Sequence, residues 1–105
     1  MKKVEMIKDR KTFNYIIKKE KFIKNEYFVI YNNENVDHRL MFGIAVPKKY
    51  GNAVERNRIK RQVRAIIDNN KNLFKNGFNY IIMVRKSCQN IKYSILNDAL
   101  IELLK

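Results

Sequence analysis

Four of the seven arginines in this chain fall within nine consecutive positions, and this cluster is the strongest chemical signal in the sequence. Lysine supplies most of the positive charge elsewhere. The guanidinium group is planar and carries five donors, so it can hold a phosphate through two hydrogen bonds or stack on a base. A charged helix face is often merely solvated, but clustered arginines in a lysine-rich chain favour a binding surface for nucleic acid. The residues that we predict to form this surface are Lys48, Lys49, Arg56, Asn57, Arg58, Lys60, Arg61 and Arg64.

The charge of the whole chain agrees with a polyanionic partner. Its 105 residues include 23 Lys and Arg against 10 Asp and Glu, a net charge of +13. Such a field attracts nucleic acids and makes their binding depend on salt. The length and the 46% hydrophobic content predict a single RNA-binding domain over 1–105. No apolar run approaches the roughly 20 residues that span a bilayer, and no signal peptide is evident. We therefore expect a cytoplasmic protein without a membrane partner.

The residue types that would make the protein itself a nuclease are missing. Phosphodiester cleavage by a protein needs grouped carboxylates that hold metal ions or a pair of histidines for acid and base catalysis. The ten acids are scattered, and His38 is the sole histidine. Cys88 is the sole cysteine, so it has no partner for an internal disulfide or a zinc site. We predict no catalytic residue, metal ion or cofactor bound by the protein.

Hydrophobic periodicity predicts the elements that must position the basic cluster. Residues 40–47 alternate between a large apolar face and a face of small residues around Gly43, which leaves room for a helix or a ligand. The chain should be polar and turned at 32–35. The order α-β-β-β-α-β-α predicts an α/β (α+β) two-layer sandwich on a four-stranded sheet. The elements are a helix over 9–20, strands over 27–31, 35–39 and 40–47, a helix over 53–68, a strand over 79–85 and a helix over 90–104.

Both later helices are predicted to be amphipathic. In the helix over 53–68 the basic side chains lie beside an apolar stripe, with Arg58 on a flank. The stripe comprises Ile59, Val63, Ile66 and Ile67. In the last helix the apolar face comprises Ile95, Leu96, Ala99, Leu100, Leu103 and Leu104.

The segment 48–61 resembles the signature of the bacterial ribonuclease P protein component, Lys48-Lys49-x-Gly51-Asn52-Ala53-Val54-x-Arg56-Asn57-Arg58-Ile59-Lys60-Arg61. The similarity extends from the basic N-terminus to the strand before Arg85. The resemblance implies a left-handed β-α-β crossover, an exception to the usual right-handed rule. It also implies a partnership with a catalytic RNA that uses bound magnesium to remove the 5′ leader of precursor tRNA.

The resemblance further implies two RNA-binding surfaces. The Arg-Asn-Arg helix should bind the RNA subunit, with Gly51 allowing a tight turn and Asn52 capping the helix. A groove across the sheet should bind the single-stranded leader by stacking on Phe13 and Tyr31. Where many relatives have a second aromatic residue one turn after Phe13, this chain has Ile17, which weakens the expected stacking.

Two other functions compete with this interpretation. A structural RNA-binding protein of the ribosome or its assembly would explain the charge but not the motif. A DNA-binding protein is less favoured, because no helix-turn-helix spacing or dimer-forming heptad is present. We therefore expect the ribonuclease P RNA and precursor tRNA as partners, and no DNA.

Overall fold

The computed structural model describes residues 6–7, 10–19, 21–35 and 38–105, and its helices and strands follow the predicted order α-β-β-β-α-β-α. The first and last residues of the helix predicted over 9–20 lie outside these residues. The elements are α1 (Arg10–Lys18), β1 (Phe22–Lys24), β2 (Phe28–Glu34), β3 (Met41–Ala45), α2 (Ala53–Asn69), β4 (Phe78–Val84) and α3 (Tyr93–Leu104), with 3₁₀ turns η2 (Lys48–Tyr50), η3 (Lys71–Leu73) and η4 (Lys86–Cys88).

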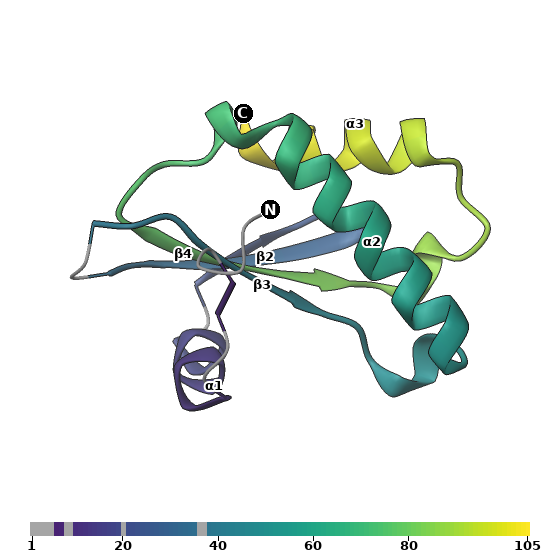
Figure 1. Ribbon diagram of the computed structural model, residues 1–105, viewed down its shortest axis with the longest axis horizontal. Coiled ribbons are helices and arrows are strands. Elements are labelled where there is room, and N and C mark those ends of the chain that lie inside the picture. Colours follow the sequence, from purple (N-terminus) through teal and green to yellow (C-terminus); the bar gives the residue numbers. More distant parts are fainter. Residues whose placement is uncertain (1–5, 8–9, 20, 36–37) are drawn as a thin grey trace.

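The four strands form one mixed sheet in the order β1-β2-β4-β3. Strands β3 and β4 are parallel, and the other neighbouring pairs are antiparallel. Helices α2 and α3 cover one face of the sheet, and α1 lies on the opposite face (Figure 1). The predicted layers of sheet and helices are therefore present, and α1 adds a helix on the other face of the sheet.

The β3-α2-β4 connection is a crossover between adjacent parallel strands. In Figure 1 both strands run from left to right with α2 above them. Helix α3 packs on β2 and lies behind α2, so the β2 side of the sheet is the far side and β3 lies nearer the viewer than β4. This arrangement is a left-handed crossover, as the family resemblance implied.

The hydrophobic core lies between the sheet and the pair α2 and α3. The predicted stripe of α2 is buried throughout, and from α3 the core receives Leu96, Ala99 and Leu100. The prediction for Ile95 is wrong, because its side chain is 45% exposed. Helix α3 begins only at Tyr93, so Ile95 lies in its first turn.

The predictions for the first two strands need correction. Residues 32–34 were expected in a turn but continue β2, where Asn32, Asn33 and Glu34 pair with β4. The side-chain amide of Asn79 donates to Asn33 and accepts from Asn35, so asparagines stabilise the end of this strand pair. The strand expected over 35–39 is absent from its described residues, 35, 38 and 39. The additional strand is instead β1, which is too short to show periodicity.

The small-residue face of β3 allows α1 to pack closely against the sheet. A Cβ atom built on Gly43 would lie 2.6 Å from Cε2 of Phe13 and 3.4 Å from Cγ1 of Ile81. The absence of a side chain at Gly43 therefore creates the space for the Phe13 ring. Ile16 and Ile81 are also buried on this side of the sheet, which secures α1 over one end of the face.

Candidate nucleic-acid interface

A groove lies on the same face of the sheet as α1, beyond the part that the helix covers. Tyr31 pairs with Ile81, and Val29 with Met83, the next pair on this face; Tyr31, Val29 and Met83 all line the groove. In Figure 1 α1 is seen nearly end-on below one end of the strands, and β3 and β4 continue to the right beyond it. The residues that line the groove are Phe22, Lys24, Val29, Tyr31, Pro47, Lys49, Met83, Val84, Arg85, Lys86 and Ser87.

The groove combines an apolar floor with a basic rim. Val29, Pro47 and Met83 provide apolar surface, and no acidic side chain is among the lining residues. Arg85 is held in place because its Nη1 atom donates to the carbonyl oxygen of Asn25 at 2.8 Å. The cations of the rim are Lys24, Lys49, Arg85 and Lys86. Such a surface fits an extended polyanion whose bases are unpaired.

Two aromatic rings stand side by side in this groove. Phe22 of β1 is paired in register with Tyr31 of β2, so their side chains share one face of the sheet. The ring centroids are 5.4 Å apart, with an angle of 50° between the planes. Phe22 is 44% exposed and Tyr31 is partly buried, so parts of both rings remain accessible to a base.

Only one of the three predicted groove residues lines this site. Tyr31 does, whereas Phe13 and Ile17 are partly buried on α1 and are not among the lining residues. The ring of Phe13 contacts the backbone at Gly43. In this structure Phe13 therefore serves to pack α1 against the sheet.

Sequence reasoning missed several groove residues. The missed residues are Phe22, Lys24, Val29, Pro47, Met83, Val84, Arg85, Lys86 and Ser87. The interleaving of basic and aromatic side chains in Lys21-Phe22-Ile23-Lys24 was the available signal. Lys49, which was predicted for the α2 surface, lies at the groove.

The outer face of α2 forms a second basic surface, on the other side of the sheet. Arg61 and Arg64 are exposed, and Lys60 is partly buried beside them. Spacings of three, four and seven residues place these side chains and Asn57 on one helical face. Together with Val54 they line a shallow depression. We name this set the α2 outer face: Val54, Asn57, Lys60, Arg61 and Arg64.

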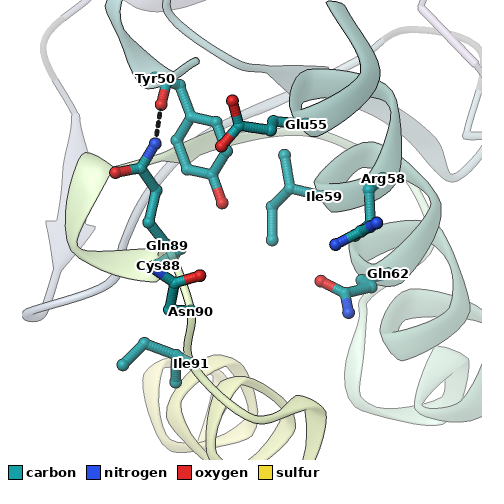
Figure 2. A pocket seen from close by; sticks show the side chains of 9 residues that line it. All are labelled: Tyr50, Glu55, Arg58, Ile59, Gln62, Cys88, Gln89, Asn90 and Ile91. Atoms are coloured by element: carbon teal, nitrogen blue, oxygen red, sulfur yellow. Dashed lines mark hydrogen bonds between the residues drawn. The ribbon is translucent and has the colours of Figure 1, made fainter. Parts of the chain in front are cut away.

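The other two arginines of the cluster do not belong to the α2 outer face. Arg58 lies on the opposite flank, where it lines a small cavity of about 120 Å³ together with Gln62 (Figure 2). Gln89 closes the far side of this cavity by donating to the carbonyl oxygen of Tyr50. Arg56 is partly buried, and its Nε atom has no hydrogen-bond partner among the described residues. The predicted single basic surface is therefore divided around the helix.

The turn before α2 is built by Gly51 and Asn52. The side chain of Asn52 accepts from the backbone N–H of Glu55 at 2.9 Å, and Glu55 accepts from the N–H of Asn52 at 3.2 Å, which completes a capping box. Gly51 has an extended backbone with φ 166°, which other residues also adopt. A Cβ atom at Gly51 would lie 2.8 Å from Oε1 of Glu55, so the glycine instead leaves room for the cap.

Two further structural findings concern metals and membranes. Among the described residues, no group of three or more His, Cys, Asp or Glu side chains is placed to hold a metal ion. Within the same part of the chain, no helix combines the length and apolar content needed to cross a bilayer. His38 is exposed in a loop, with a left-handed backbone at φ 56°.

Comparisons with known proteins agree on one family. The family model described as Ribonuclease P matches residues 1–105. The ribonuclease P protein component of Mycoplasma mycoides is 44% identical over 106 residues, covering 100% of this chain and 97% of the relative. That of Streptococcus pneumoniae serotype 4 is 37% identical, covering 100% of this chain and 85% of the relative.

Solved structures of two relatives share the fold. The RNase P protein from Thermotoga maritima superposes with a TM-score of 0.86 at 33% identity, covering 96% of each chain. An RNase P protein from Staphylococcus aureus, described as a mutant with defective mRNA degradation activity, superposes with a TM-score of 0.89 at 31% identity. This match covers 97% of the present chain and 86% of the other.

Proposed function

We propose, because the chain belongs to the ribonuclease P protein family, that it binds the catalytic RNA subunit through α2 and the 5′ leader of precursor tRNA in the groove. The resulting ribonucleoprotein would remove the leader by endonucleolytic cleavage in the cytoplasm, where precursor tRNA is made. The partners are thus the RNA subunit and precursor tRNA.

The observation that carries the proposal is the uncovered groove with its aromatic pair and basic rim. A single strand can stack its bases on Tyr31 and lay its phosphates near Lys24 and Lys86. The bases of a duplex are already stacked on one another, so stacking on the two rings adds less to the binding of a duplex. The groove is therefore suited to the leader, which is the single-stranded part of the substrate.

The α2 outer face is suited to a folded RNA. Its cations are fixed on a capped helix of 17 residues, so they can meet phosphates that the RNA holds at set positions. Arg58 extends this contact to the flank near Gln62. Lys48, exposed in η2, lies just before the helix and adds positive charge at its N-terminal end.

We assign the hydrolysis to the RNA subunit and the magnesium ions that it binds. The protein supplies cations between two polyanions and so lowers their mutual repulsion. Lower repulsion favours the binding of precursor tRNA to the RNA subunit. In this mechanism the side chains of the protein bind and orient RNA, and none of them transfers a proton to the scissile phosphate.

Substitution of Tyr31 tests the groove. In the reconstituted holoenzyme, we expect Tyr31→Ala to weaken precursor tRNA binding by about 1 to 3 kcal/mol, the range for one lost base–aromatic contact. Mature tRNA lacks the leader, so its affinity should hardly change. Filter binding of both tRNAs, with circular dichroism of the free protein as the folding control, measures the effect.

Equal losses for the two tRNAs would mean that Tyr31 acts through stability or RNA docking rather than through the leader. Recovery of partner RNA from cells addresses the wider assignment. Co-purification of one RNA of several hundred nucleotides is expected, whereas recovery of ribosomal subunits would favour a role in the ribosome or its assembly.

A further inference from the structure

The strand β1 contributes nothing to the hydrophobic core, although it carries two large apolar side chains. All three of its residues are exposed, with Phe22 at 44% and Ile23 at 43%. Keeping large apolar side chains in water brings no folding benefit, and a short edge strand can be built without a ring. The contact with the Tyr31 ring gives Phe22 one packing partner, but it leaves 44% of the side chain exposed and does not explain that exposed apolar surface.

The register of the sheet explains where the Phe22 ring lies. Phe22 is opposite Tyr31, and Lys24 is opposite Val29, so alternate residues of β1 extend the groove face of the sheet. Ile23 pairs with Ile30 and points to the other face. Phe22 and Lys24 thus line the groove, and Ile23 does not.

The position of Phe22 also compensates for Ile17. An aliphatic side chain on α1 offers no π-face to a base, and Ile17 is not among the groove residues. The ring of Phe22 stands 5.4 Å from that of Tyr31, so the second ring of the groove is provided by β1 rather than by α1. Lys24 lies two residues further along the same face and lines the same groove, so its ammonium group adds positive charge for a phosphate beside the rings.

We propose that Phe22 binds the leader: with Tyr31 it forms a platform of two rings on which neighbouring unpaired nucleotides of precursor tRNA stack. This assignment rests on the leader groove proposed above. It adds a contact on the edge strand, and it predicts that the affinity gained from the leader depends on an aromatic ring at position 22.

A set of variants at two neighbouring positions tests the platform in the reconstituted holoenzyme. Phe22→Ala should weaken precursor tRNA binding by about 5- to 20-fold, near the low end for one stacked base because the ring is partly covered by Tyr31. Mature tRNA should bind as before. Phe22→Tyr should keep the affinity, and Phe22→Leu, which retains apolar surface without a π-face, should lose it.

Ile23→Ala is the matched control. It removes a similarly exposed side chain from the same strand, but on the face away from the groove, so precursor tRNA affinity should not change. Thermal unfolding of each free variant checks the fold.

Four outcomes would overturn the platform. If Phe22→Ala has no effect while Tyr31→Ala weakens precursor tRNA binding, Phe22 is not part of the leader site. The proposed function then remains intact. Full affinity of Phe22→Leu, or equal losses for precursor and mature tRNA, would exclude stacking by Phe22. If Phe22→Ala and Tyr31→Ala both leave precursor binding unchanged, the leader groove itself is refuted.

Discussion

Cys88 places a thiol inside the protein, where its Sγ atom donates to the carbonyl oxygen of Tyr27 at 3.2 Å. Burial raises the pKa of this thiol from 9.0 to about 11, and burial also raises the pKa of Tyr50 nearby. Both shifts favour the protonated form in the folded state. The thiol of Cys88 is therefore a structural group that remains neutral at physiological pH.

This pKa shift predicts a pH dependence of stability. The folded state holds the thiol proton more tightly, so the contribution of Cys88 is complete below pH 9 and is lost as the pH rises towards 11. Urea unfolding should show a steeper loss of stability over this range in the wild type than in Cys88→Ala, by on the order of 2 kcal/mol. Burial is the main cause of the raised pKa of Tyr50, and the neighbouring Cys88 adds to it, so the difference between the two curves reports Cys88 together with its effect on Tyr50. Parallel curves would contradict the shift.

Helix α2 presents apolar residues to the sheet and basic residues to the outside. Its buried stripe faces the sheet, while Arg61 and Arg64 face outward and Arg58 points to the flank. Arg56 is partly enclosed. The exposed arginines of the α2 outer face can consequently be changed without disturbing the core.

The double variant Arg61→Ala/Arg64→Ala should therefore weaken assembly with the RNA subunit and leave the fold intact. Each lost phosphate contact should reduce the slope of log affinity against log salt by about one, so a decrease near two is expected. Electrophoretic binding at several salt concentrations measures it. The control Lys75→Ala/Lys92→Ala removes two exposed charges elsewhere. If the control lowers the slope as much, binding depends on net charge and not on the α2 outer face.

Helix α1, which packs against β3, is the other element next to the groove. Gly43→Ala would bring a methyl group to 2.6 Å from the Phe13 ring, so either the ring or the helix must move. We expect a loss of about 1 to 3 kcal/mol of unfolding free energy, as for other overpacked positions. In a Phe13→Leu background the same change should cost less, because the ring is gone. Chemical denaturation of the four proteins gives the coupling, and additive losses would show that Phe13 does not occupy this space.

At the scale of the whole molecule, the two basic surfaces lie on opposite sides of the sheet. Helix α2 covers one face, and the groove opens on the face that carries α1 (Figure 1). A folded RNA on α2 and a single strand in the groove can therefore be bound at the same time. The net charge of +13 adds a long-range attraction for both.

This separation predicts two different salt dependences. Raising monovalent salt from 50 to 200 mM should weaken protein–RNA assembly by about 10³-fold or more if six or more phosphates are contacted. The ratio of precursor to mature tRNA affinity in the preassembled holoenzyme should fall much less, because stacking in the groove is not ionic. Titrations at matched salt concentrations measure both quantities. A ratio that falls as steeply as assembly would indicate that the leader is held by charge alone.

Features that depend on neighbouring residues could be predicted from the sequence by itself. The buried stripe of α2, the cap at Asn52 and the location of the arginine cluster all follow from residues within a few positions of one another, because helical period and capping are local. The parallel crossover and the family followed from the motif of segment 48–61. The asparagines at 32–35 led to the wrong prediction of a turn. Their side-chain amides instead contact Asn79, far along the chain, and stabilise the strand.

Only the tertiary structure decided which residues form the groove. Phe22 lies beside Tyr31 because of the register between β1 and β2, and Met83 joins them through β4. A shift of one residue would turn each of these side chains to the opposite face. Likewise, the packing of α2 determined that Arg56 is partly enclosed while Arg61 is exposed. The pairing of β2 with β4 and the packing of α2 are set by contacts between segments far apart in the chain, and the basic and aromatic residues at 21–24 were the one local signal of the groove.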